Sequence, residues 1–306
     1  MSNFKFRSSD GLDIYVYKWL SQNEEIKGVV QIAHGMAENA SRYERFANFL
    51  NDRGYIVYAN DHRGHGKTAG SIEELGYLAD ENGFDFLVED MHDLSLIIKE
   101  DYPNLPVFLF GHSMGSFSAQ RYIMIYDRIL DGLILSGSNG RQGNILKAGV
   151  LFSKFEIEKN GRKYKSQRLH NLVFGKYNNA FKPNRTSSDW LTRDDREVDK
   201  YIEDPYCGTV FTAGFFHDFL AGLLSIEDKK NFDLIPKDIP IYILSGDKDP
   251  VGNFGKGVKN LYNRYIELGL KDVEYKLYKD GRHEMLNEIN REEVFEDIVK
   301  WLDSRL

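Results

Sequence analysis

Short apolar runs recur along this chain of 306 residues and alternate with longer segments of helical periodicity. Within each run most side chains are apolar at consecutive positions, so a strand formed there would bury both of its faces. This pattern is typical of a parallel sheet that helices cover on both sides. Six runs predict such strands: residues 28–35, 55–61, 106–113, 132–138, 240–249 and 273–283.

The start of the chain has a different pattern. Residues 4–7 and 12–19 alternate apolar and polar side chains on either side of Asp10-Gly11. Because Asp-Gly favours a tight turn between two strands, this stretch predicts an antiparallel hairpin.

Segments between the runs have apolar residues at helical spacing. Ser41 and Glu44 have the spacing of a capping box at the start of a helix over residues 41–53, and Phe46, Phe49 and Leu50 then lie on one face. Strands that alternate with helices through short connections indicate an α/β fold with a mostly parallel sheet. Further helices are expected over residues 84–100, 116–126, 255–268 and 291–306.

The alternation stops between residues 141 and 237. This stretch is rich in aromatic residues but has no run of the buried-strand type, and it is too long for a bare loop in a compact domain. We therefore expect a mostly helical insertion over residues 141–237, with residues 1–140 and 238–306 forming the α/β core. No long apolar stripe marks the insertion as an exposed, lipid-facing lid.

Composition and charge exclude several classes of protein. The 47 acidic and 40 basic residues give a net charge of −7, and no basic face stands out that would bind a nucleic acid. The single cysteine, Cys207, allows neither an intrachain disulfide nor a cysteine-based metal site and favours a reducing cytosol. The first residues lack the apolar core of a signal peptide, and no apolar run reaches the length of a membrane span. We expect a cytoplasmic protein with at most transient contact with a membrane surface and no obligate protein partner.

One motif carries a candidate nucleophile. The sequence Gly111-His112-Ser113-Met114-Gly115 joins a predicted strand to a predicted helix. A G-x-S-x-G turn of this kind is so tight that small residues must flank the serine, whose Oγ then stands clear of the sheet under backbone strain. The alternative is a polar residue in an ordinary strand-to-helix turn. The flanking strand and helix favour the nucleophile.

A serine nucleophile needs an acid and a base later in the chain. His283 follows the last strand-like run, although an exposed loop histidine is the alternative. Asp247 and Asp249 both lie beyond the preceding buried run. Asp249 is the better candidate for the acid because it lies further from the strand end and precedes Pro250, which leaves the other aspartate as a turn former.

An oxyanion hole needs two backbone N–H groups that face the nucleophile. One candidate is the N–H of Met114, at the start of the helix after the serine. The other is the N–H of Met36, which follows His34-Gly35 on the loop after the first buried run.

The segment 60–68 contains His62 and His65 beside Asp61. A metal site is the weaker interpretation, because no second cluster of ligands has a suitable spacing. We expect these histidines to support loops at the carboxyl edge of the sheet, with one of them bracing the nucleophile loop.

Five motifs, taken in order, resemble those of the α/β-hydrolase superfamily: HGMAENASRY, DHRGHGKT, GHSMGS, GDKDPVG and GRHEMLNE. More narrowly, the chain is similar to the monoacylglycerol lipase and bacterial lysophospholipase group, which is also described as serine aminopeptidase-like. The similarity extends from about Gly28 to the last residues. Three segments of the insertion also resemble the cap of that group: FGKYNNAF, DWLTRDDREVDKYIEDPYCG and FTAGFFHDFL.

The resemblance implies a triad of Ser113, Asp249 and His283, with the N–H groups of Met36 and Met114 as the oxyanion hole. It selects the second of the two aspartates, which aligns with the acid of the family. It also implies a helical cap over the site, a small-molecule acyl ester as substrate, and no metal or organic cofactor. Members of the group cleave monoacylglycerols, lysophospholipids, simple esters and occasionally aminoacyl amides.

Other functions stay open at this point. A general short-chain carboxylesterase would use the same machinery. A serine aminopeptidase similar to proline iminopeptidases would need a carboxylate in the insertion to hold the α-amine of its substrate. A non-catalytic binding protein of the hydrolase fold is disfavoured, because all three triad members are present. The candidate carboxylates are Glu156, Glu158, Asp194, Asp195 and Asp218.

Overall fold

The computed structural model describes residues 1–126 and 129–306, and within these residues eight strands form one sheet. Their order is β1-β2-β4-β3-β5-β6-β7-β8. β1 and β2 form an antiparallel hairpin, β2 pairs antiparallel with β4, and the remaining pairs are parallel. The predicted α/β fold with an antiparallel entry hairpin is confirmed. The strands are β1 (Ser2–Arg7), β2 (Asp13–Trp19), β3 (Gly28–Ala33), β4 (Tyr55–Asn60), β5 (Val107–His112), β6 (Gly132–Ser136), β7 (Ile241–Gly246) and β8 (Val273–Tyr278).

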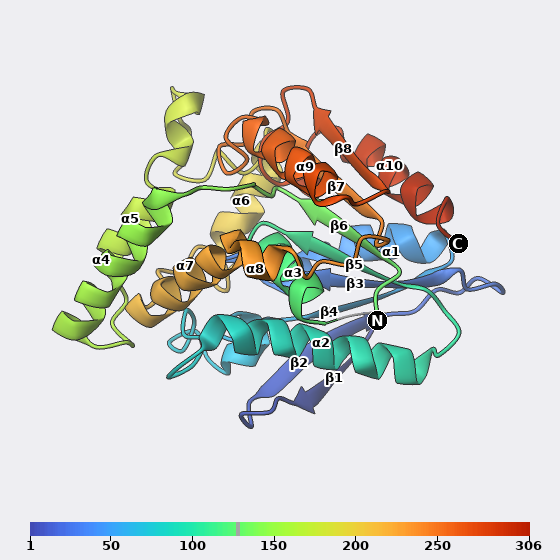
Figure 1. Ribbon diagram of the computed structural model, residues 1–306, viewed down its shortest axis with the longest axis horizontal. Coiled ribbons are helices and arrows are strands. Elements are labelled where there is room, and N and C mark those ends of the chain that lie inside the picture. The colour runs from blue at the N-terminus through green and yellow to red at the C-terminus, as the bar shows by residue number, and fades with distance from the viewer. Residues whose placement is uncertain (127–128) are drawn as a thin grey trace.

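Helices cover both faces of this sheet (Figure 1). On one face lie α1 (Glu44–Asp52) and α10 (Arg291–Asp303), where the rings of Phe46 and Phe295 pack 5.0 Å apart. On the other face lie α2 (Gly83–Asp101), α3 (Met114–Ile125) and α9 (Lys256–Leu268). This double covering explains why every residue of β3, β4, β5, β6 and β7 is buried.

Two local expectations were wrong. β8 was expected to be buried on both faces, but it is the last strand of the sheet and exposes Glu274 and Tyr275. The capping box at Ser41 does not form either. A short 3₁₀ helix (Ala40–Tyr43) precedes α1, and Asn39 caps it by accepting a hydrogen bond from the Ser41 N–H. Asn39 is itself a strong N-cap residue, and it lies two positions earlier in the chain than the predicted cap.

The insertion between β6 and β7 is helical, as predicted. In Figure 1, α4 and α5 project beyond the left end of the sheet. α7 packs against the core, because the ring of Phe219 lies 6.1 Å from that of Phe84 and 6.2 Å from that of Phe117. The boundaries at residues 141 and 237 stay a prediction. The helices of this region are α4 (Asn144–Asn160), α5 (Gln167–Phe174), α6 (Asp195–Glu203), α7 (Ala213–Glu227) and α8 (Lys229–Phe232).

An exposed apolar stripe runs along α4, contrary to expectation. Ile145, Ala148, Leu151 and Phe155 are all exposed, and they fall within about 120° around the helix axis at 100° per residue. The opposite side of α4 buries Leu146 and other residues against the insertion. Because α4 has apolar residues on both of its sides, the sequence pattern does not indicate which of them are exposed. Among the described residues, no helix is both long enough and apolar enough to cross a bilayer.

A buried arginine links the entry hairpin to helix α2 of the core through hydrogen bonds. The guanidinium of Arg63, on the loop after β4, donates hydrogen bonds to Asp90 of α2 at 2.8 and 3.1 Å, to Asp10 at 2.8 Å and to Ser8 at 3.0 Å. The Arg63 and Asp90 side chains are completely buried. Burial alone raises the pKa of Asp90, and the hydrogen bond and positive charge of Arg63 oppose that rise. Removal of Arg63 would leave a buried carboxylate without its cation.

We predict that Arg63→Met lowers the free energy of unfolding by about 3–5 kcal/mol, the range found when one partner of a buried ion pair is removed. Urea denaturation at neutral pH measures this change. Arg7→Met is the matched control, because Arg7 pairs with Asp13 on the exposed surface of the same hairpin and should change stability little. Equal losses in the two variants would contradict the prediction.

Candidate active site

A cavity of about 600 Å³ lies where the carboxyl ends of β3, β5 and β8 meet the insertion. In an open α/β sheet this edge is the usual place for a ligand. The core contributes residues from three loops to the cavity wall, and the insertion contributes both aromatic and polar side chains. The main lining residues are Gly35, Met36, Ala37, Glu38, His112, Ser113, His283 and Glu284 from the core, and His170, Asn171, Phe174, Asn178, Trp190, Leu191, Tyr201 and Cys207 from the insertion.

Ser113 occupies a strained turn between β5 and α3. Its φ of 50° and ψ of −116° are unfavourable for a residue with a side chain. The Ser113 N–H donates to the Ser136 carbonyl at 2.9 Å, and the Ser113 carbonyl accepts from the N–H groups of Ser116 and Phe117. A Cβ atom on Gly115 would collide with the carbonyl oxygens of Ala33 and His34. The motif therefore has the strand, the helix and the small residue that the elbow requires.

Asp249 and His283 form a buried pair at the edge of the same cavity. The His283 Nδ1 lies 3.0 Å from both carboxylate oxygens of Asp249, and the two side chains are 2% and 0% exposed. A carboxylate can only accept, so Nδ1 carries the proton and Nε2 of the neutral ring is the acceptor. Asp249 also accepts from the Ser245 hydroxyl at 2.9 Å and from the Val251 N–H at 2.8 Å. These contacts fix the carboxylate and, through it, the ring.

The charges of the pair stabilise each other. Burial alone would lower the pKa of His283, but the carboxylate of Asp249 outweighs burial and raises that pKa above its ordinary value. Burial alone would raise the pKa of Asp249, whereas His283 and the hydrogen-bond donors hold it below its ordinary value. Asp247 lies apart from the pair and accepts a hydrogen bond from the Asp280 N–H at 2.8 Å, which is the role of a turn former.

The loop that carries Met36 is fixed at two consecutive peptide groups. The Gly35 N–H donates to Glu38 Oε1 at 2.5 Å, and the Gly35 carbonyl lies 2.7 Å from Nδ1 of His34. Because a peptide group is planar and trans, the Met36 N–H points away from the side on which the Gly35 carbonyl lies. The N–H of Met114 begins α3, so it has no carbonyl partner within the helix. Met114 follows Ser113 in the chain, and Met36 lines the same cavity as Ser113. The role of the two N–H groups as oxyanion donors stays a prediction.

His62 and His65 brace this loop and not the nucleophile loop. The rings of His62 and His65 lie 4.3 and 5.1 Å from that of His34, and the His62 N–H donates to His34 Nε2 at 3.0 Å. Burial lowers the pKa of His34 and of His65 to about 3 and that of His62 well below its ordinary value, so all three rings are neutral. In residues 1–126 and 129–306, no three His, Cys, Asp or Glu side chains are arranged to hold a metal ion.

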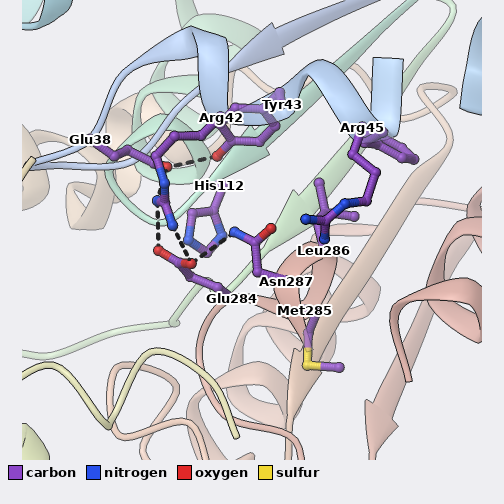
Figure 2. Close-up of a pocket in the computed structure, with 10 residues that line it drawn as sticks. Glu38, Arg42, Tyr43, Arg45, His112, Glu284, Met285, Leu286 and Asn287 are labelled. Carbon is purple, nitrogen blue, oxygen red and sulfur yellow. Dashed lines mark hydrogen bonds and ion pairs between the residues drawn. The ribbon is translucent and has the colours of Figure 1, made fainter. Parts of the chain in front are cut away.

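Sequence patterns missed several residues at the site. Trp190 of the insertion lies over His283, with ring centroids 5.0 Å apart. Glu38 and Glu284 line the cavity and both pair with Arg42. Figure 2 shows these pairs in a close-up of a second, smaller pocket that Arg42 and Arg45 also line. The i, i+4 spacing of Glu38 and Arg42 was a usable signal for this ion pair. No spacing rule connects Trp190 or Glu284 to the site, because tertiary contacts place them there.

Comparisons with known proteins agree with this architecture. The sequence profile of the family described as serine aminopeptidase, S33, matches residues 24–290. A monoacylglycerol lipase of Mycolicibacterium smegmatis is 29% identical over 310 residues, which cover 100% of this chain and 98% of the relative. The monoglyceride lipase of Homo sapiens is 28% identical over 305 residues, covering 97% and 89%. The crystal structure of a thermostable carboxyl esterase from Bacillus coagulans, in complex with glycerol, is 31% identical, has a TM-score of 0.92 and covers 99% and 98%.

We predict that Ser113→Gly is more stable than Ser113→Ala by about 1 kcal/mol, because glycine relieves strain of about 1–3 kcal/mol at a positive φ. Thermal and urea denaturation of the two variants measure the difference. Ser116, the third residue of α3, provides the control: there the order should reverse, since glycine destabilises a regular helix. An alanine variant that is the more stable at both positions would show that Ser113 is not strained.

Proposed function

Since the chain belongs to the serine aminopeptidase, S33, family, we propose that it is a serine carboxylic ester hydrolase that uses Ser113, His283 and Asp249 to cleave a small lipid ester. Monoacylglycerol or lysophospholipid is the proposed substrate. The observation that carries the proposal is the buried Asp249–His283 pair, which shares one cavity with the strained Ser113. The proposal needs all three features together: a buried Asp–His pair, a strained serine, and a position of that serine in the same cavity.

The proposed reaction is a two-step acyl transfer. Ser113 Oγ attacks the ester carbonyl while His283 Nε2 accepts its proton, and the imidazolium then protonates the leaving alcohol. Asp249 holds the ring in the required tautomer and stabilises the imidazolium. The N–H groups of Met36 and Met114 stabilise the oxyanion, each by about 3–4 kcal/mol. Water activated by His283 then releases the acid and restores Ser113.

The cavity supports a substrate with one apolar and one polar end. Its volume of about 600 Å³ lies in the range of small-molecule sites. Phe174, Leu191 and Trp190 offer apolar surface to an acyl chain, whereas Asn171 offers a hydrogen bond to an alcohol group. The named activities of the relatives and the glycerol bound to the Bacillus coagulans esterase are consistent with such an ester.

Transient contact with a membrane surface is part of the proposal. The exposed stripe on α4 includes Ile145 and Leu151, each 69% exposed, and belongs to the same insertion whose α5 lines the cavity. An apolar helix face of this kind partitions into the boundary between lipid head groups and acyl chains. A lipid ester would then reach the cavity without passing through water.

An aminopeptidase activity has less support. The carboxylates that were candidates for holding an α-amine are either engaged elsewhere or exposed to solvent. Glu156 accepts from the Ser166 hydroxyl, Asp194 pairs with Arg291 and Asp218 pairs with Arg162. Glu158 and Asp195 lie on the exposed surface. A general short-chain esterase stays an alternative that substrate profiling resolves.

The first test concerns the catalytic residues. Ser113→Ala should abolish hydrolysis of p-nitrophenyl butyrate and labelling by a fluorophosphonate probe, while the melting temperature stays near that of the wild type. Asp249→Asn should lower kcat by about 10⁴-fold, because the imidazole then adopts the wrong tautomer. Asp247→Asn is the matched control and should keep nearly full activity. Esterase activity retained by Ser113→Ala would refute the assignment of the nucleophile.

A second test concerns the substrate. Turnover of a medium-chain monoacylglycerol, a lysophospholipid, p-nitrophenyl esters of graded length and proline-4-nitroanilide is compared at equal enzyme concentration. We expect the highest kcat/KM on a lipid ester and no Ser113-dependent release of nitroaniline. Efficient cleavage of the anilide would favour the aminopeptidase. A preference for acetate and butyrate esters over both lipids would favour the general esterase.

A further inference from the structure

Three charged side chains, two of which line the large cavity, form a closed cluster that Figure 2 shows from the side of the smaller pocket. Arg42, in the 3₁₀ helix before α1, donates from Nη1 to Glu38 at 2.6 Å and to Glu284 at 2.8 Å, and from Nη2 to Glu284 at 2.7 Å. The side chains of Arg42, Glu38 and Glu284 are 12%, 5% and 6% exposed. Burial would raise the pKa of Glu284, but the Arg42 guanidinium holds it at about 2, so this carboxylate is ionised.

Glu38 connects the cluster to the loop that carries Met36. Its Oε1 accepts from the Gly35 N–H at 2.5 Å and from the Tyr43 hydroxyl at 2.9 Å, while Oε2 accepts from Arg42. A carboxylate held on both oxygens cannot rotate without losing a bond. Its position therefore sets the orientation of the peptide group that immediately precedes the Gly35–Met36 peptide.

Glu284 connects the cluster to the loop that carries His283. Its carboxylate receives the two Arg42 donors and the Asn287 side-chain amide at 2.8 Å, and its backbone N–H donates to the Leu191 carbonyl at 2.7 Å. The residue next to His283 is thus fixed through both its side chain and its backbone. Among the residues that the structure describes, only Arg42 bonds to both carboxylates.

We propose that Arg42 is a positioning residue that holds the loop of Met36 and the loop of His283 at a fixed separation on either side of Ser113, an inference that rests on the proposed function. Arg42 is absent from the residues that line the large cavity, so it acts through Glu38 and Glu284 and not on substrate. Its planar fork binds a carboxylate at two points and fixes direction as well as distance. A contribution to stability does not explain why these three charges are buried together, because buried ion pairs are often no more stabilising than apolar side chains.

The cluster also acts on the charge of the base. The titratable and charged groups that face His283 are Asp249 after β7, His112 at the end of β5, Glu284 on its own loop and Glu38 across the cavity. Burial lowers the pKa of His283; Asp249 opposes it most strongly, and Glu284 and Glu38 add to the rise. Removing the charge of Glu284 should therefore make His283 easier to deprotonate.

The kinetic test uses full-length Arg42→Gln and Arg42→Lys with p-nitrophenyl butyrate. We expect Arg42→Gln to lower kcat roughly 10- to 100-fold with KM near the wild-type value, because a small misplacement of reacting groups has effects of this size. Arg42→Lys should lie between Arg42→Gln and the wild type, because lysine keeps the charge but lacks the fork. Arg45→Gln is the matched control. Arg45 also lines the smaller pocket drawn in Figure 2 but pairs with Glu197 of α6, so the kcat of this variant should match that of the wild type.

The pH profile gives a readout that a purely structural role would not change. The acidic limb of kcat/KM reports protonation of the base in the free enzyme. Glu284→Gln keeps the shape of the side chain and removes its charge, so this limb should move to lower pH, whereas Arg45→Gln should leave it in place. If Arg42→Gln does not fold, the pH profile of Glu284→Gln tests the proposal in its place.

The outcomes separate this proposal from the proposed function. If the wild type hydrolyses the ester and Arg42→Gln has the same kcat and pH profile, the positioning role is overturned while the hydrolase stands. The positioning role is also overturned by a second combination of results. In it, the fall in kcat of Arg42→Gln, Arg42→Lys and Arg45→Gln is proportional to the fall in their melting temperatures, and the acidic limb of Glu284→Gln stays at the wild-type pH. If the wild type shows no Ser113-dependent hydrolysis, the proposed function fails and the positioning role falls with it.

Discussion

No side chain fits at Gly115, and the rest of the site is arranged around this close contact between two backbones. A Cβ atom there would collide with the carbonyl oxygens of Ala33 and His34, so α3 begins directly against the end of β3. The contact places the turn of Ser113 beside the loop that starts at Gly35, where an added Cβ would lie 3.3 Å from the Cβ of Ser113. Strain at Ser113 persists because the hydrogen bonds on both sides of it hold the turn in place.

Buried charges are the second organising feature of the site, and each has a partner of opposite sign or several donors. Asp249 is satisfied by His283, Ser245 and Val251, which keeps the imidazole in one orientation. In a region with little water such contacts are stronger than at the surface, and an unpaired charge would be correspondingly costly. The same rule explains why the buried Arg63 carries a full set of acceptors at the entry hairpin.

The insertion is part of the site and not a separate cover. Trp190 packs on His283, and the Leu191 carbonyl accepts from the Glu284 N–H. Arg282, next to His283, donates to the carbonyl of Thr192 at 3.1 Å. The part of the insertion that lies nearest His283 is therefore held in place by the loop that carries His283. α4, which carries the exposed apolar stripe, projects beyond the end of the sheet, and α5 lines the cavity (Figure 1).

The sequence by itself determined the strands, their parallel arrangement and the order of the Ser113, Asp249 and His283 motifs, because these depend on local patterns: consecutive apolar residues, a G-x-S-x-G turn and polar residues at strand ends. It could not determine that β8 is an edge strand, since exposure depends on which neighbour is missing. Only the tertiary structure decided that His62 and His65 support His34, and that Glu38, Arg42 and Glu284 meet. The spacing of Glu38 and Arg42 is local, but the contact from Arg42 to Glu284 joins residues 242 positions apart, and no short-range pattern encodes it.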